Sequence, residues 1–146
     1  MMKKLLKKSK SGGFSMTELL CVLLVMGLLT ASLTVGITAA MHAYRDSVSL
    51  SEAKTLYYTL SAGLHDALCY DSSKPEVKTD NSGHITVDGQ KLIPDKSYTK
   101  GLTAAVSVTE QTPEGQPMYY TVSLSVSGSG DSALVSGTFD IIPVNR

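Results

Sequence analysis

The sequence contains two pairings of a serine with a lysine three residues later, a spacing found in certain serine hydrolases. They are Ser51-Glu52-Ala53-Lys54 and Ser97-Tyr98-Thr99-Lys100. In such enzymes the serine attacks the substrate and a Lys-Thr-Gly element completes the site. That element is missing here, and so short a pattern arises by chance in a serine-rich chain. The two pairings therefore give no support to a hydrolase, and we expect no enzyme.

Residue types that bind metals or nucleotides are sparse. His42, His65 and His84 are widely separated, and no cysteine or acidic cluster accompanies them at metal-ligand spacing. We expect each histidine to be structural or solvated, and we expect no metal or other cofactor. No phosphate loop of the Gly-x-x-x-x-Gly-Lys type is present, so the chain is not expected to drive its own assembly with ATP.

Cys21 and Cys69 are the two thiols of the sequence. If both lie on one helix, roughly 70 Å separates them, which excludes a disulfide within the chain. The end of the chain must then be held by packing and hydrogen bonds. Cys69 is expected to be an unpaired structural cysteine, with a cross-link between subunits as the alternative.

A carboxylate, Glu18, lies at the start of a long apolar run. The run from Leu19 to Met41 has 23 residues without a charge, and as a helix it spans roughly 34 Å, enough to cross the hydrocarbon core of a bilayer. A buried helix of a soluble protein is the alternative, but a domain of this size can hardly cover such a helix on all sides. Five lysines among the first ten residues indicate that the N-terminal end is cytoplasmic and that the chain downstream lies outside.

Two common N-terminal signals fit this arrangement poorly. A secretory signal normally has an apolar region of about 7 to 15 residues and a small-residue cleavage site. The run here is longer, and Thr38-Ala39-Ala40 is only a weak candidate site. A lipoprotein signal carries its cysteine after the apolar run, whereas Cys21 lies near the beginning of this one.

The segment Gly13-Phe14-Ser15-Met16-Thr17-Glu18, followed directly by the apolar run, resembles the prepilin signal of type IV pilins and type II secretion pseudopilins. The resemblance implies that residues 1–13 are a leader, which a prepilin peptidase removes by cutting after Gly13. It implies that the same enzyme methylates the new amino terminus at Phe14. It further implies that Glu18, the fifth residue after the cut, acts in filament assembly, with an assembly ATPase and a membrane platform protein as partners.

Glu18 needs a compensating charge, because a carboxylate at the edge of hydrocarbon is costly unless it is neutralised or paired. The cut would create an amino group at Phe14, one helical turn away and on the same face. The resemblance implies that Glu18 instead pairs with the amino terminus of a neighbouring subunit. A glutamate that merely reaches out to the membrane interface is the alternative.

The apolar run also contains residues that permit close approach between helices in lipid. They are Gly27, Gly36 and a set of small or hydroxylated residues, Thr30, Ala31, Ser32, Thr34, Thr38, Ala39 and Ala40. Related pilins often carry a proline in this segment and lose helical structure there, but this chain has no proline before Pro75. Any such flexibility would rely on Gly27 and Gly36. The alternative is that glycine is simply frequent in membrane helices.

Residues 14–44 are therefore predicted to form a transmembrane assembly helix, and residues 45–70 its amphipathic continuation. Apolar residues recur at helical spacing up to Leu68, and the segment from Asp71 to Pro75 should end the helix. The segment from Ser47 to Glu52 is where the helix would bend, and because Ser49 and Glu52 match a capping box, a restarted helix is the alternative to a continuous one there.

Residues 71–146 are predicted to form a small antiparallel β head. Turn signals occur at Asp88-Gly89, Pro113-Glu114-Gly115 and Ser127-Gly128-Ser129-Gly130. The strand candidates are His84 to Val87, Lys91 to Ile93, Thr103 to Thr109, Met118 to Val126 and Ala133 to Ile142. In the fourth, Tyr120, Val122, Leu124 and Val126 alternate with polar residues, and we expect Leu56, Leu60 and Leu64 of the helix to cover this apolar face. The expected fold is α+β, with the outer half of a long helix packed on the sheet.

The leading hypothesis is a structural subunit, pilin or pseudopilin, of a type IV pilus-like filament used for adhesion, motility, secretion or DNA uptake. Its partners would be copies of itself and related pilins, and membrane lipid before assembly. From Phe14 onward the chain has eight basic and thirteen acidic residues, so direct nucleic-acid binding is not expected. The alternative is a single-pass membrane-anchored protein that binds an extracellular ligand and does not polymerise.

Overall fold

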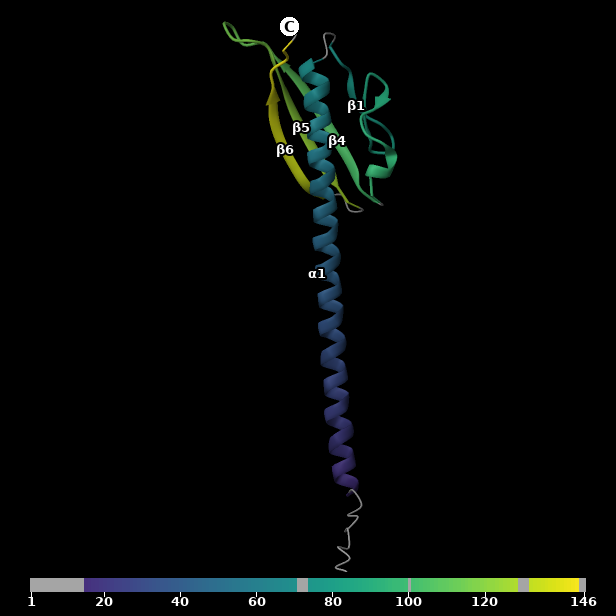
Figure 1. Cartoon of the computed structure of the whole chain (residues 1–146). Coiled ribbons are helices and arrows are strands. Elements are labelled where there is room, and N and C mark those ends of the chain that lie inside the picture. Colours follow the sequence, from purple (N-terminus) through teal and green to yellow (C-terminus); the bar gives the residue numbers. More distant parts are fainter. Residues whose placement is uncertain (1–14, 71–73, 100, 129–131, 145–146) are drawn as a thin grey trace, which may run out of the picture. The chain divides into compact units, whose positions relative to one another are not determined.

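The structure of the chain is a computed structural model that describes residues 15–70, 74–99, 101–128 and 132–144. It has the predicted α+β fold, with one long helix followed by antiparallel sheets (Figure 1). The elements are α1 (Met16–Tyr70), β1 (Val77–Thr79), β2 (Ile85–Val87), β3 (Gln90–Lys91), the 3-10 helix η1 (Asp95–Ser97), β4 (Thr103–Gln111), β5 (Tyr119–Ser127) and β6 (Ala133–Ile141). The chain divides into two compact units, Met1–Ala43 and Tyr44–Arg146, and each is described separately below.

Helix α1 continues without interruption through the segment where a bend or restart was the alternative. The hydroxyl of Ser49 donates a hydrogen bond to the carbonyl of Asp46 (3.0 Å) instead of capping a new helix. A serine that bonds back to the preceding turn is tolerated inside a helix. The alternative of a restarted helix is therefore excluded, and the structure describes the helix as far as Tyr70.

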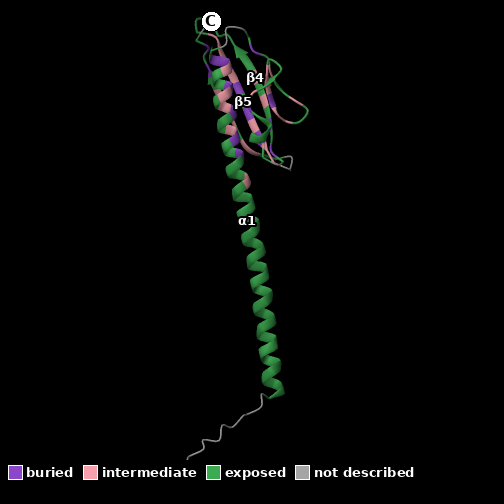
Figure 2. Ribbon diagram, turned by 45° about the vertical axis from the view of Figure 1, so that its right-hand side comes forward, coloured by how far each residue is buried: buried purple, intermediate pink, exposed green. Residues whose placement is uncertain are grey.

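The larger sheet has the strand order β4-β5-β6 and packs against the outer half of α1. Tyr120, Val122, Leu124 and Val126 of β5 are all buried, as their alternation with polar residues predicted. They share a core with the predicted helix residues Leu56, Leu60 and Leu64, of which the last two have no exposed surface. Figure 2 shows that the buried residues of α1 are confined to this stretch.

A smaller sheet with the order β1-β2-β3 corrects the prediction of a single sheet. β1 was not predicted, because its three residues, Val77–Thr79, are too few to show a period. β2 and β3 are joined by a two-residue turn in which Asp88 and Gly89 have φ values of 51° and 78°, as a type I′ turn requires. The Asp88-Gly89 signal is thereby confirmed.

Hydrogen bonds join the small sheet to β4 at two places, the turn between β1 and β2 and the strand β1. The backbone N–H of Ala104 donates to the carbonyl of Gly83 (2.8 Å), and the N–H of Val106 donates to Oγ1 of Thr79 (3.2 Å). Gly83 has a φ of 73°, and a Cβ at this position would lie 2.6 Å from Cβ of Thr103. Glycine is therefore needed for both its conformation and its lack of a side chain.

The remaining strand boundaries differ from the predicted ones by one or two residues. β2 begins after His84, β3 ends at Lys91, β4 extends to Gln111, β5 runs one residue later at each end and β6 ends at Ile141. Strand ends depend on which backbone groups find partners in the fold, which side-chain alternation does not reveal. The turn at Gly115 has the expected positive φ of 78°, and residues 129–131 of the last turn signal lie outside the described residues.

The end of the chain is attached to the last turn of α1 without a disulfide. The N–H of Val144 donates to the carbonyl of Cys69 (2.9 Å), and Sγ of Cys69 lies 3.6 Å from the carbonyl oxygen of Ile142. Cys69 is only 6% exposed. Its burial agrees with a structural cysteine and argues against the alternative of a cross-link between subunits.

Candidate assembly site in the first turns of the helix

The first turn of α1 is organised around Ser15, which precedes the helix. Its carbonyl accepts the N–H groups of Glu18 (2.9 Å) and Leu19 (3.1 Å), and its hydroxyl hydrogen-bonds that of Thr17 (2.7 Å). Serine is a preferred residue at this position because it tolerates the non-helical conformation and satisfies local polar groups. The predicted cleavage and methylation residues, Gly13 and Phe14, lie outside the described residues.

Glu18 lies exposed in this first turn. A carboxylate is favoured there because the free N–H groups give the start of a helix a partial positive charge. Glu18 also stands at one end of a shallow groove that follows one side of the helix through Cys21, Val22, Val25, Met26 and Leu29. It is the one charged residue that lines this groove. The structure thus places an acidic group at the end of an apolar stripe.

The first unit presents apolar side chains on every side of α1. Leu19, Leu23 and Leu28 are each more than half exposed, and the same holds for most large apolar residues up to Ile37. Of the described elements, α1 is the one helix long and apolar enough to cross a membrane, judged by length and composition. A soluble monomer rarely exposes so large an apolar surface, which indicates that another apolar phase or another chain covers it.

The hydroxyl groups within this stretch are satisfied by the helix itself. Thr30, Thr34 and Thr38 each donate to the carbonyl four residues earlier at 2.8 Å, and Ser32 donates to the carbonyl of Leu29 at 2.9 Å. Because these donors are already bonded, they need no water, and the segment tolerates a lipid environment.

Gly27 and Gly36 lie within unbroken helix. A Cβ added at either position would meet nothing within 4 Å, so no contact with a described residue requires a glycine there. Their role in the flexibility of the membrane helix stays a prediction.

In the second unit, the fold assembles a polar cluster that the spacing of histidines did not predict. Nδ1 of His84 is buried, lies 3.2 Å from Oδ1 of Asp95 and 3.9 Å from Oδ2 of Asp80, and makes no hydrogen bond of good geometry to a described residue. The His84 ring packs on that of Tyr98, with centroids 4.1 Å apart. The hydroxyl of Tyr98 in turn accepts the N–H of Ile85 (3.0 Å). These contacts link the β1–β2 turn to η1 and the residue that follows it through His84.

Hydrogen bonding shifts the pKa values around this cluster. The backbone N–H of His84 bonds the carboxylate of Asp80 and lowers the pKa of that carboxyl. The Lys91 ammonium, 2.6 Å from Oδ1 of Asp95, lowers the pKa of Asp95, and the bond raises the pKa of Lys91. Burial raises the pKa of Tyr98. Among the described residues, no group of three or more His, Cys, Asp or Glu side chains is arranged to hold a metal ion.

The serines of the two serine–lysine pairings line one hollow of about 340 Å³, which lies between α1 and the segment 97–99 at the end of η1. Both Ser51 and Ser97 line it, but Lys54 does not, and Lys100 lies outside the described residues. The hollow, which we call the Glu52 pocket, is lined by Ser51, Glu52, Thr55, Leu56, Thr59, Ser97 and Thr99. The residues of α1 on one side of the pocket are far in sequence from Ser97 and Thr99 on the other side. No repeating pattern of side chains predicts that they line one pocket.

Comparisons of the chain with protein-family models, with curated proteins and with solved structures found no significant match.

Proposed function

We propose that this protein is a structural subunit, pilin or pseudopilin, of a type IV pilus-like filament. The observation that carries the proposal is a helix that is apolar and exposed on all sides from Leu19 to Ile37, with one carboxylate, Glu18, in its first turn. The prepilin-like residues directly before it support the same conclusion.

In this proposal lipid covers the apolar segment first, with the leader in the cytoplasm and the β head outside. A prepilin peptidase cuts after Gly13 and methylates the amine of Phe14. During extraction by an assembly ATPase and a platform protein, Glu18 pairs with the amine of a neighbouring subunit. The apolar segments of many copies then pack together away from water, which replaces lipid contacts by contacts between helices.

Mass spectrometry of the native protein tests the processing step. The expected product lacks residues 1–13 and carries one added methyl group on Phe14. Replacement of the residue before the cut, Gly13→Val, should leave the leader attached. An intact leader in the native protein would contradict the proposal and would favour the membrane-anchored ligand-binding protein.

Incorporation into filaments tests the role of Glu18. Glu18→Ala should be cut and methylated normally but should be depleted from filaments sheared from the cell surface. Thr17→Ala is a matched control one residue away, and it should incorporate normally. Normal incorporation of processed Glu18→Ala would refute the assembly role.

A further inference from the structure

The Glu52 pocket offers hydrogen-bond acceptors above an apolar base. Oγ1 of Thr55 donates to the carbonyl of Ser51 (3.0 Å), and Oγ1 of Thr59 donates to the carbonyl of Thr55 (2.8 Å). Because these hydroxyl protons are committed to the helix, the oxygens remain as acceptors. Leu56, which is 3% exposed, contributes apolar surface.

Glu52 is the one charged residue that lines the pocket. Its carboxylate makes no ion pair with the described residues. A group with several donors, no acceptors and a positive charge on an aliphatic stem fits such a lining, and the side chain of lysine has these properties.

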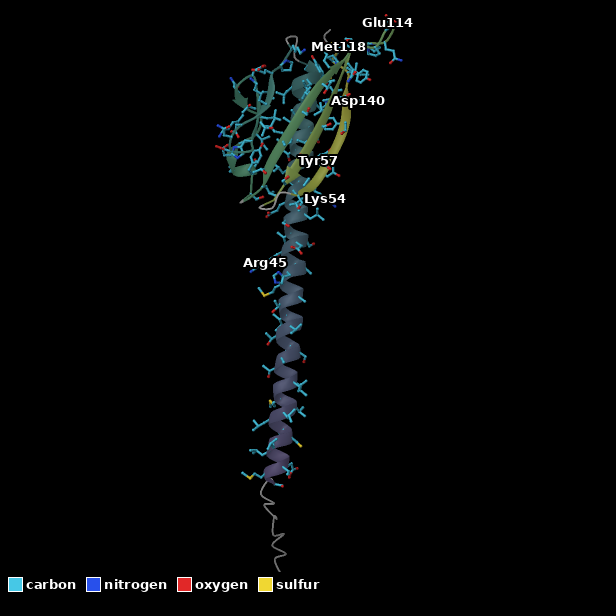
Figure 3. The ribbon with its side chains drawn as sticks, turned by 180° about the vertical axis from the view of Figure 1, so that it is seen from behind. Arg45, Lys54, Tyr57, Glu114, Met118 and Asp140 are labelled. Atoms are coloured by element: carbon cyan, nitrogen blue, oxygen red, sulfur yellow. The ribbon has the colours of Figure 1, made fainter. Side chains whose placement is uncertain are left out.

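Several lysines of the second unit are already engaged. Lys74 pairs with Glu110, Lys78 with Glu76 and Lys91 with Asp95. Lys54, which is labelled on α1 in Figure 3, forms no ion pair within the described part of the chain, and the same holds for Lys96.

The geometry of a helix keeps Lys54 away from the pocket of its own chain. Lys54 follows Glu52 by two residues, which places the two side chains about 160° apart around α1. The cation and its complementary pocket therefore lie at the same level of the helix but on different sides. Lys54 is thus available to another molecule, whereas it does not line the pocket of its own chain.

We propose that Lys54 of one copy inserts into the Glu52 pocket of a second copy, with its ammonium on the Glu52 carboxylate and its stem over Leu56. Because the two surfaces differ, each copy donates one lysine and accepts another, and the contact propagates from subunit to subunit instead of closing as a symmetric dimer. This inference rests on the proposed filament function. In the filament, the contact would set how the head of one subunit is aligned with the head of its neighbour.

Charge reversal in the full chain, expressed with the filament assembly machinery, tests the contact. Glu52→Lys and Lys54→Glu should each lower the ratio of sheared filament to processed membrane protein about tenfold, because each juxtaposes like charges between copies. The double variant Glu52→Lys/Lys54→Glu restores opposite charges and should recover the ratio to within about twofold of the wild type. The processed protein in the membrane serves as the measure of folding.

The control is Lys96→Glu, which makes the same charge change next to Ser97 on the rim of the pocket. It should leave the ratio unchanged. Should a single reversal lower the processed membrane pool itself, the neutral variants Glu52→Gln and Lys54→Gln replace it, with a smaller expected decrease.

Three results would overturn the inference while leaving the proposed function intact: single variants that assemble like the wild type, a double variant no better than the singles, or an equal defect in Lys96→Glu. If the processed wild-type chain enters no filament at all, the proposed function fails and this contact fails with it.

Discussion

The two halves of helix α1 have the same secondary structure but opposite relations to their surroundings. Between Met16 and Ala43 every described residue is exposed, and the large side chains are apolar on all sides. Between Tyr44 and Tyr70 one stripe is buried against the sheets, and exposed residues fill the rest of the surface. Among the described residues, the first half has no buried position, whereas the second half has a buried stripe.

The difference shows what each half requires from its environment. A backbone helix bonds its own polar groups, so in lipid the first half needs only apolar side chains and internally bonded hydroxyls. In water the second half gains its stability mainly from the apolar surface that it removes from solvent. Substitutions of the same kind should therefore have different effects in the two halves.

The largest difference is expected for removal of a large apolar side chain. Leu60→Ala should lower the free energy of unfolding of the second unit by about 2–5 kcal/mol, because Leu60 is fully buried and its loss leaves a cavity. Tyr58→Ala, at a position that is 67% exposed, should have little effect. Near-ultraviolet circular dichroism of the full chain in detergent, followed against urea, measures both.

Leu28→Ala is the matching change in the first half. Leu28 is 65% exposed, so this variant should unfold its head at the same urea concentration as the wild type. A loss comparable to that of Leu60→Ala would contradict the contrast between the halves.

Introduction of a charge should have its larger effect in the first half of α1. Leu28→Lys places an ammonium within the apolar run and should weaken membrane insertion by about 3 kcal/mol. Tyr58→Lys puts the same charge on the exposed side of the second half and should leave insertion unchanged. Extraction of membranes at alkaline pH distinguishes inserted from peripheral protein. Equal extraction of both variants would show that the first half does not require lipid.

Glycine-to-alanine changes should distinguish a position where the fold requires glycine from one where it accepts a side chain. Gly83→Ala should destabilise the second unit by about 1–3 kcal/mol, because it combines a positive φ with a clash against Thr103. Gly36→Ala meets no neighbouring atom and should stabilise the helix by about 0.5–1 kcal/mol.

The rate of labelling of Cys69 with a thiol reagent, in a chain that also carries Cys21→Ser, reports opening of the second unit. Labelling should accelerate in Gly83→Ala and stay unchanged in Gly36→Ala. Reduced filament incorporation of Gly36→Ala would support the flexibility predicted for this residue.

The smallest effect is expected from acid. The folded pKa of Asp80 is lowered, chiefly by the His84 N–H, so its contribution to stability is present above the ordinary pKa of 3.8 and is lost as the pH falls through the folded pKa. Asp80→Asn keeps the side-chain acceptor but does not titrate, so its stability should depend less on pH below about 4. Urea midpoints measured across this range compare the two, and identical pH profiles would refute the role of Asp80.

Much of the fold could be predicted because it depends on local periodicity. The apolar run, the end of α1 at Tyr70 and the inward residues of β5 all follow from side chains that recur with the period of their own element. The Asp88-Gly89 turn followed from the conformations that these two residues adopt readily. The capping pattern at Ser49 is compatible both with a restart and with a continuous helix, so the sequence did not decide between them.

The candidate sites divide in the same way. Glu18 stands out in the sequence because a charge next to a long apolar run is conspicuous without any knowledge of tertiary structure. His84 lies close to Asp95, and Glu52 shares one pocket with Ser97 and Thr99. In both cases the residues come from separate elements. Neither arrangement leaves a local signal.

By itself, the sequence determined which part of the chain is suited to lipid, where the helix ends and which face of the central strand is apolar, because hydrophobicity and backbone preference act over a few neighbouring residues. Only the tertiary structure decided that the strands form two sheets, that Gly83 approaches Thr103 and that Glu52 shares a pocket with Ser97 and Thr99. These features depend on how distant segments pack, and packing is set by the shapes and hydrogen bonds of the whole unit.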